Sequence, residues 1–366
     1  MLNTYKLDGL TIVVPSYNRQ GLLLRLMRYW SGKSAILLVL DGSDCPFEAK
    51  ILSELESNVR YIHHPVGLYA RLKQAATLVE TEFVMMGTDD DFFVPSALEA
   101  CIKELKENTR LISCGGLAVG FGFENAMYLR KVYPNLKNHE LLNDIAYERT
   151  AKHFANYEPA HLYSVQRAES WTKLAEGIFS REFDFFAAWE LQFEFLVPYL
   201  GPTKIINNLL WMRGFEVEPI RGTSASMSYD NYIFDWWKNP EYETDKEQFI
   251  SHMNNIYFNI TGKKHDNFKQ DICNSFELFI STNEKSVRGI KPRLKKIIPQ
   301  FVWIFLKTNI SKMNLRNQRF NSHIPTAFTE FTRNGIEFEV REIDDLLQHI
   351  EEYHLSRNSI KHNKPH

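Results

Sequence analysis

The chain has 366 residues, which allows two domains or one large domain with an appendage. Its 44% hydrophobic and 13% aromatic content excludes a chain that is disordered throughout. A formal net charge of −2 argues against nucleic acid as a partner. Four scattered cysteines without CxxC spacing indicate reduced thiols in a cytoplasmic protein. No signal-peptide core opens the sequence and no apolar run is long enough to span a bilayer, so we expect no transmembrane helix.

The first 115 residues alternate short apolar runs with segments of helical periodicity. We predict strands over 10–14, 35–40, 59–62, 83–86 and 111–114, and helices over 21–30, 47–55, 68–79 and 97–107. The last helix begins directly after Ser96, and Ser96 and Glu99 have the spacing of a capping box. Because the strands are apolar throughout, they indicate an α/β fold with a mainly parallel sheet that is covered on both faces.

Polar residues directly follow three of the predicted strands, where ligands of such sheets bind. These segments are Pro15-Ser16-Tyr17-Asn18-Arg19, Asp41-Gly42-Ser43-Asp44 and Thr88-Asp89-Asp90-Asp91. Three adjacent carboxylates after a buried strand repel one another and lose hydration, so they call for a counter-charge. Their hard oxygen atoms suit Mg²⁺ or Mn²⁺, which complete their shell with phosphate oxygens. A solvated acidic turn is the alternative reading.

The usual glycine-rich phosphate loops are missing from the sequence. There is no GxxxxGK[ST] motif, and no GxGxxG follows the first strand. This argues against a P-loop nucleoside triphosphatase and against a dinucleotide-dependent dehydrogenase.

Together the strand-end segments resemble the glycosyltransferases of the GT-A fold, and in particular the inverting enzymes of family 2. The first segment is similar to the family's VPTYNR and the second to its VDDGS, with Leu40 in place of the first Asp. Ala70-Arg71-Leu72 resembles the family's ARN, and the Asp triplet followed by Pro95 resembles its DxD region. The resemblance covers roughly residues 8–220 and is nearest to a divergent bacterial branch with an Asp-Asp-Asp motif.

The resemblance implies a role for each matched residue. Pro15, Tyr17 and Arg19 would border the nucleotide base and ribose, Asp41 would accept a hydrogen bond from uracil N3–H, and Arg71 would lie near the base or the diphosphate. Asp89, Asp90 and Asp91 would hold the ribose and a Mn²⁺ or Mg²⁺ ion. The sequence leaves open whether Asp91 pairs with Asp89 or with Asp90 as metal ligand. The ion would stabilise the charge of the departing nucleoside diphosphate.

An inverting transferase also needs a carboxylate that accepts the proton of the acceptor hydroxyl. The family places this base about eleven residues before a glycine, and counting back from Gly201 leads to Glu190. Glu194, on the same helix face, and Asp184 are the fallbacks. An ordinary helix carboxylate is the alternative reading of Glu190. Aromatic neighbours would raise the pKa of Glu190, which favours a base near neutral pH.

The family's QxxRW motif is absent after this segment. Three further residues are candidates for contacts with the donor phosphates or the acceptor: Arg213, Arg221 and His161. The alternatives are surface ion pairs for the two arginines and a structural role for the histidine.

The sequence changes character after residue 225. We predict a GT-A domain over 1–225 and a mostly helical region over 226–366. Residues 285–319 hold ten basic and no acidic residues around a short apolar stretch, as is typical of a segment that contacts an anionic membrane. The alternative is a helix packed on the catalytic domain, with the acidic segment 330–352 pairing within the chain or in a homodimer. Residues 356–366 are expected to be unstructured.

The resemblance implies metal-dependent, inverting transfer of a sugar from a nucleotide-sugar, expected to be UDP-linked. The acceptor would be a glycan or a lipid-linked saccharide in bacterial surface polysaccharide synthesis. The enzyme would act in the cytoplasm, at the inner face of the cytoplasmic membrane. Alternatives that stay open are a nucleotidyltransferase of similar topology, transfer of a non-sugar phosphate group, and a non-catalytic glycan-binding or scaffold protein.

Overall fold

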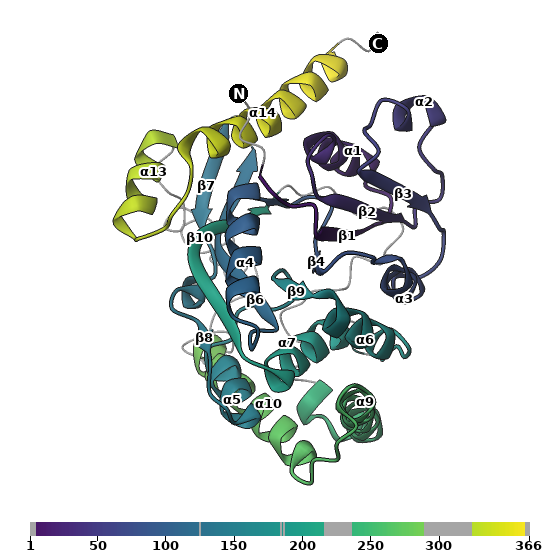
Figure 1. Ribbon diagram of the computed structural model, residues 1–366, viewed down its shortest axis with the longest axis vertical. Coiled ribbons are helices and arrows are strands. Elements are labelled where there is room, and N and C mark those ends of the chain that lie inside the picture. The colour runs from purple at the N-terminus through teal and green to yellow at the C-terminus, as the bar shows by residue number, and fades with distance from the viewer. Residues whose placement is uncertain are drawn as a thin grey trace, which may run out of the picture.

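The computed structural model describes residues 5–123, 126–183, 185, 187–215, 236–288 and 324–362. Its central feature is a ten-stranded sheet in the order β3-β2-β1-β4-β9-β6-β10-β5, with β7 paired to β6 and β8 paired to β10 (Figure 1). The strands are β1 (Leu10–Ser16), β2 (Ile36–Asp41), β3 (Val59–His63), β4 (Phe83–Met86), β5 (Phe92–Phe93), β6 (Ser113–Phe123), β7 (Met127–Lys131), β8 (Glu140–Leu141), β9 (Val165–Arg167) and β10 (Thr203–Gly214). β1 to β4 are parallel, whereas β9 runs antiparallel to β4 and β6. The sheet as a whole is therefore mixed, and its parallel half is the half predicted from the sequence.

Helices cover both faces of the sheet (Figure 1). They are α1 (Gln20–Trp30), α2 (Ala49–Leu52), α3 (Leu68–Leu78), α4 (Pro95–Glu107), α5 (Ala146–Ala155), α6 (Ala168–Ile178), α7 (Ala188–Leu200), α9 (Glu243–Thr261), α10 (Phe268–Arg288), α13 (Ile324–Arg333) and α14 (Val340–His362). Ile12 and Val14 of β1 face a core shared with α1, α4, α13 and α14, whereas Val13 faces a core shared with α3, α5, α6, α7, α9 and α10. Since alternate strand residues point to opposite faces, the apolar runs reflect burial on both sides, which confirms the α/β prediction.

The start of α4 differs from the predicted capping box. Pro95 occupies the first turn, and Ser96 makes no capping bond within its own helix. Instead, the Ser96 backbone N–H donates to Glu342 Oε1 of α14 at 3.0 Å, and its hydroxyl donates to the same carboxylate. Glu99 accepts a bond from the Lys6 N–H rather than from the helix start. A carboxylate from a distant helix thus provides the cap, which local spacing does not reveal. The predicted helix over 47–55 is also shorter and is reduced to α2.

The C-terminal helices pack on the sheet from both sides rather than forming a separate core. α9 and α10 belong to the same apolar cluster as α3, α6 and α7. Phe331 of α13 and Ile343 of α14 are fully buried in the opposite cluster, beside α1 and α4. α14 continues to His362, so regular structure ends later than the predicted boundary at residue 356.

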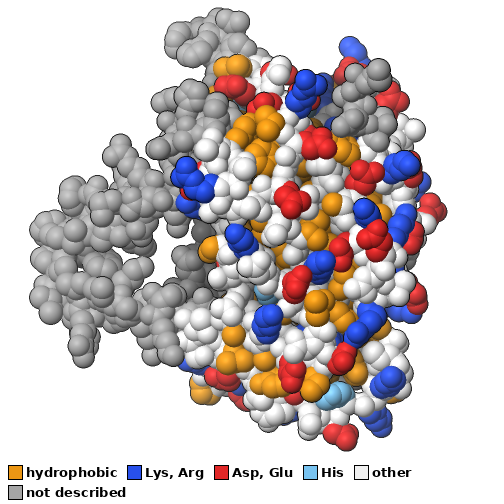
Figure 2. Space-filling model, turned by 60° about the vertical axis from the view of Figure 1, so that its left-hand side comes forward, with side chains coloured by type: hydrophobic (Ala, Val, Ile, Leu, Met, Phe, Trp, Pro, Cys, Tyr) orange, Lys and Arg blue, Asp and Glu red, His pale blue; other side chains and the backbone are white. Residues whose placement is uncertain are grey.

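Several predictions about the C-terminal region fall on residues that are not described. The domain boundary after residue 225 lies within the gap 216–235, and most of the basic segment 285–319 lies beyond α10. None of the described helices is long and apolar enough to cross a membrane. On the face shown in Figure 2, basic and acidic side chains of the described residues are interspersed. Membrane contact through 285–319 and a homodimer stay predictions.

Candidate functional site

The Asp triplet lies just beyond β4, beside the loop that follows β1. Arg19 Nη1 is 2.8 Å from Asp89 Oδ1, and Arg19 Nη2 is 2.5 Å from Asp90 Oδ2. The Ser16 hydroxyl donates to Asp89 Oδ2 at 2.7 Å. Burial alone would lower the pKa of Arg19, but the charges of Asp89 and Asp90 raise it overall. Arg19, which the resemblance places beside the nucleotide base and ribose, therefore supplies part of the counter-charge that the triplet needs.

The third carboxylate of the triplet is bonded to β10. Trp211 Nε1 donates to Asp91 Oδ2 at 2.8 Å, and the Gly214 backbone N–H donates to Asp91 Oδ1 at 2.8 Å. A Cβ atom on Gly214 would lie 2.5 Å from the Asp90 carbonyl oxygen, so glycine permits this close approach. The sequence does not predict these roles of Trp211 and Gly214, because nothing in the local pattern connects them to a motif about 120 residues earlier.

Burial strongly perturbs the acidity of this triplet. It raises the pKa of Asp91 to about 7, and the Asp90 charge adds to the effect. Burial likewise raises the pKa of Asp89 to about 6, although Arg19 opposes the shift. The surrounding protein therefore does not fully neutralise the negative charge of Asp89 and Asp91, and both carboxylates favour binding a proton or a cation near neutral pH.

The donor set of the triplet fits a divalent cation that takes few protein ligands. Asp89 and Asp91 are 3% and 4% exposed, whereas the Asp90 side chain is 20% exposed. Each carboxylate oxygen has two lone pairs, so the oxygens that accept one hydrogen bond keep capacity for an ion. Mg²⁺ binds through one or two carboxylates and leaves its other positions to phosphates and water. Arg19 pairs with both Asp89 and Asp90, so this contact does not separate the two. Asp90 suits the role better than Asp89 because its side chain is more exposed and Asp89 also accepts the Ser16 hydroxyl. Asp91 suits it because its two bonds come from the uncharged donors of Trp211 and Gly214.

Asp41 and Arg71 organise the neighbouring strand ends. Asp41 is fully buried at the end of β2 and accepts bonds from the Ser43 N–H at 2.9 Å, the Ser43 hydroxyl at 2.5 Å and the Tyr61 hydroxyl at 2.7 Å. Arg71 Nη1 donates to the carbonyl oxygens of Ser16 and Leu40, at 2.5 and 2.8 Å. Burial lowers the pKa of Arg71. Arg71 thus links the ends of β1 and β2, and in the structure its donors serve the backbone.

The other two residues predicted to border the base lie in the same loop. Pro15 pairs in register with Leu40 near the end of β1, and Tyr17 follows the strand directly. Both side chains are half-buried. Asn18 comes next with a left-handed backbone, φ 53°, and its N–H donates to the Ser43 hydroxyl at 2.8 Å. This turn directs the chain into α1, where Arg19 meets the triplet.

The two candidate bases on α7 have different surroundings. Glu190 is half-buried and accepts one bond from the Tyr157 hydroxyl at 3.0 Å. Burial and the Glu194 charge raise the pKa of Glu190 to about 7. Glu194 is fully buried and accepts from the backbone N–H groups of His161 and Leu162 at 3.0 and 2.9 Å. Burial would raise the pKa of Glu194, but the adjacent histidines lower it to about 2. Asp184 lies outside the described residues.

The remaining predicted contacts separate into three cases. The Arg213 guanidinium lies over the Tyr133 and Phe215 rings, at 5.0 and 5.2 Å from their centres, and its charge lowers the pKa of Asp91. His161 is 1% exposed and is held between Glu194 and Thr203, so it makes structural contacts in this structure. Arg221 lies outside the described residues.

The described contacts thus form two groups. One joins the loop after β1, the Asp triplet and the end of β10, with Arg71 and Asp41 alongside. The other joins α5, α7 and the loop before β9 around Glu190 and Glu194. The first group has the acidic and hydrogen-bonding character of a metal–diphosphate site, and the second contains a carboxylate with a pKa near neutrality.

Comparison with known protein families gives a match in the N-terminal part of the chain. Residues 11–163 match the family model described as Glycosyl transferase family 2. This range contains the loops after β1, β2 and β4, whereas α7 and β10 follow it. No curated protein sequence matches the chain.

The chain is also similar to solved structures of a Staphylococcus aureus protein. The crystal structure of S. aureus TarS 1-349 has 12% identity and a TM-score of 0.48, over 79% of this chain and 76% of that chain. The crystal structure of S. aureus TarS 1-349 in complex with UDP-GlcNAc has 12% identity and a TM-score of 0.42, over 77% and 92%.

The parallel strands β1 to β4, the residues gathered at their carboxyl ends and the match over 11–163 lead to one conclusion. The chain is a glycosyltransferase with a GT-A fold that resembles family 2.

Proposed function

We propose that the protein transfers a sugar from a nucleotide-sugar to a glycan or lipid-linked acceptor, with a divalent cation and with inversion at the sugar carbon. The observation that carries this proposal is the Asp triplet beside Arg19 at the carboxyl ends of β1 and β4, within the family 2 match. Asp90 and Asp91 would hold Mn²⁺ or Mg²⁺. Once bound, the ion supplies positive charge that stabilises the diphosphate leaving group.

The protein residues around the triplet would orient the donor. Trp211 and Gly214 fix the Asp91 carboxylate through both oxygens, so the ligand is held before the donor arrives. Asp89, positioned by Ser16 and Arg19, is suited to accept a ribose hydroxyl. Pro15 and Tyr17 would border the base, and Asp41 would meet uracil N3–H in a UDP-linked donor. Arg213, close enough to influence Asp91, is suited to the diphosphate.

Glu190 is the best-supported base for the acceptor hydroxyl. Among the described residues it accepts one hydrogen bond, on Oε1, which leaves Oε2 for the acceptor, and its pKa of about 7 lets it accept a proton near neutral pH. Glu194 lacks both properties, since backbone and histidine groups occupy it and its pKa is about 2. The acceptor proton would pass to Glu190 as the new glycosidic bond forms and the bond to the diphosphate breaks. Action in the cytoplasm, in surface polysaccharide synthesis, completes the proposal.

Nucleotide binding with and without metal tests the donor site. UDP, GDP and CDP would each be titrated into the protein with Mn²⁺ and with EDTA, and the melting temperature measured. We expect stabilisation by UDP with Mn²⁺, and its loss in EDTA and in Asp91→Asn. Asp44→Asn, a change of the same chemistry in the neighbouring exposed loop, should retain it. If no nucleotide stabilises the wild type with metal, the donor-site assignment is wrong.

A further inference from the structure

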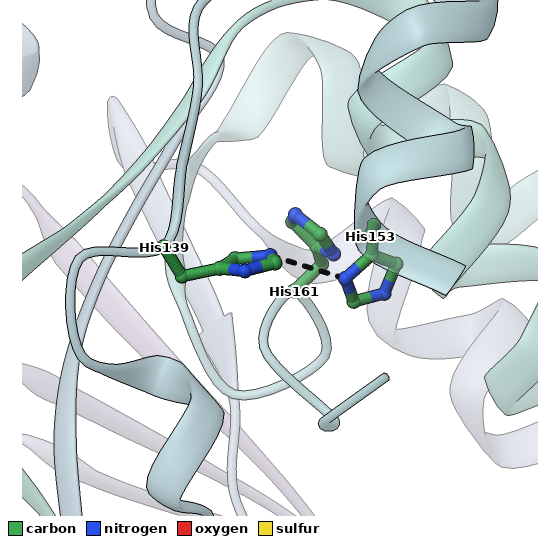
Figure 3. Close-up of side chains that lie close together, drawn as sticks. All are labelled: His139, His153 and His161. Carbon is green, nitrogen blue, oxygen red and sulfur yellow. Dashed lines mark hydrogen bonds between the residues drawn. The ribbon is translucent and has the colours of Figure 1, made fainter. Parts of the chain in front are cut away.

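Three buried histidines converge from three separate parts of the chain (Figure 3). His139 precedes β8, His153 lies on α5, and His161 lies in the loop between α5 and β9. They are 6%, 0% and 1% exposed, and one ring nitrogen of each lies within 4.8 Å of the other two. The closest approach joins His139 Nε2 and His153 Nδ1 at 3.1 Å. The donor-site chemistry proposed above uses none of these nitrogens.

The Glu194 carboxylate fixes the orientation of two of the rings. His161 Nδ1 donates to Glu194 Oε2 at 2.8 Å, and His153 Nε2 lies 3.0 Å from the same oxygen. When those nitrogens carry the protons, His161 Nε2 and His153 Nδ1 keep free lone pairs. Metal-bound histidines in proteins usually donate their second N–H to a carboxylate in this way. His161 Nε2 also lies 3.0 Å from the Thr203 hydroxyl, which offers an oxygen atom at the cluster.

The separation of one pair of nitrogens matches a shared ion, and the nitrogen of the third ring lies within 4.8 Å of both. Metal–nitrogen distances of about 2.0–2.1 Å in a tetrahedral site place two ligand nitrogens roughly 3.3 Å apart. The 3.1 Å between His139 Nε2 and His153 Nδ1 is close to this value. Three imidazoles suit Zn²⁺ and its first-row neighbours, whereas Mg²⁺ and Mn²⁺ prefer the oxygen atoms of the Asp triplet.

We propose that His139, His153 and His161 form a binding site for Zn²⁺ or a similar first-row divalent transition-metal ion, with Glu194 as the carboxylate that orients the ligands. Water or the Thr203 hydroxyl completes the shell. The site is separate from the Asp triplet and does not depend on the proposed donor chemistry. Its ion would tie the segment before β8, α5 and the loop before β9 to α7, the helix that carries Glu190. The second metal would therefore support the position of that helix.

Metal analysis of the full chain tests the site directly. The protein would be prepared without a polyhistidine tag, treated with chelator, and titrated with Zn²⁺ and with Co²⁺. We expect one tightly bound Zn²⁺ per chain by elemental analysis, a rise in melting temperature, and the intense visible absorption of four-coordinate Co²⁺. Asp91→Asn should leave all three unchanged, which distinguishes this site from the triplet. A wild type that takes up no stoichiometric Zn²⁺ and gives no such spectrum would show a hydrogen-bonded histidine network and overturn the proposal.

Two substitutions of His139 test whether this residue binds the metal. His139→Gln should abolish the Co²⁺ absorption, whereas His64→Gln, which changes a histidine bonded to Gln74 outside the cluster, should not. If His139→Gln does not fold, His139→Cys provides the second readout. A thiolate ligand should retain one bound Co²⁺ and add a sulfur-to-cobalt charge-transfer band. An unchanged spectrum in His139→Cys would exclude His139 as a ligand.

Discussion

The matched pair Glu190→Gln and Glu194→Gln separates a catalytic carboxylate from a structural one. Both residues lie on α7, one turn apart, and both substitutions replace a carboxylate by an amide of the same shape. We expect Glu190→Gln to lose transfer but keep its stability, and Glu194→Gln to lose stability. The two residues are therefore each other's control.

The expected loss for Glu194 follows from its pKa. A shift from 4.5 to about 2 corresponds to about 3 kcal/mol of stabilisation of the folded state at neutral pH. Because the folded-state pKa is depressed, this contribution is present above pH 4.5 and is lost as the pH falls toward 2. The amide in Glu194→Gln also turns N–H donors toward the N–H groups of His161 or Leu162, which adds to the loss.

Glu190→Gln should behave differently. Burial disfavours the charge of Glu190, so its removal should not lower the free energy of unfolding at pH 8, and the Gln oxygen can still accept the Tyr157 bond. Loss of a general base typically lowers the rate by about 10² to 10⁴-fold. In the wild type, the rate should fall about tenfold per pH unit below pH 7, because Glu190 becomes protonated.

Urea unfolding at pH 8 and the rate of nucleoside diphosphate release would measure both effects. Sugar transfer by Glu190→Gln at the wild-type rate would exclude Glu190 as the base. A Glu194→Gln variant that matches the wild type in stability while losing transfer would identify Glu194 as the base.

Three further changes test the strand-end site. Metal–nucleotide affinity should weaken about tenfold per pH unit below pH 7, because the cation must displace the proton of Asp91; calorimetry between pH 5.5 and 8 would check this, and a flat profile would contradict it. Gly214→Ala places a Cβ 2.5 Å from the Asp90 carbonyl oxygen, so it should weaken metal–nucleotide binding while the melting temperature changes little. Binding with wild-type affinity would argue against a tight contact there. Gly42→Ala places a Cβ 2.5 Å from the Arg71 guanidinium, so it should lower the free energy of unfolding in urea by about 1–3 kcal/mol. An unchanged free energy of unfolding would show that the Arg71 side chain can move away.

The sequence predicts the parallel half of the fold well because its signals are local. β1, β2 and β4 are continuous apolar runs with both faces buried, and the polar segments at their ends meet as the strand-end rule requires. The antiparallel strands β5, β7, β8 and β9 are short or depend on distant partners, so no local period identifies them. The predicted capping box at Ser96 is wrong for the same reason, because the Ser96 N–H bonds to Glu342, which is distant in the sequence.

In the candidate site, too, the sequence predicts the features that have a local signal and not those that depend on distant residues. The triplet and Asp41 could be found from their positions after apolar runs. The bonds from Trp211 and Gly214 to Asp91 could not, because they depend on the register of β10 beside β5 and β6. Spacing on a helix also cannot rank Glu190 against Glu194, since both lie on one face. The histidines and backbone groups around Glu194 come from another part of the chain and decide the ranking.

The contact between α14 and the start of α4 has a consequence for synthesis on the ribosome. Glu342 is made 246 residues after the Ser96 N–H that it caps. At about 5–20 residues per second, that gap corresponds to roughly 12 to 50 s of translation. Throughout this interval the nascent N-terminal half exposes the apolar surface that Phe331 and Ile343 later cover. α13 and α14, which are made long after this half, therefore complete its core, and chains that stall before these helices are made should be the ones that chaperones retain.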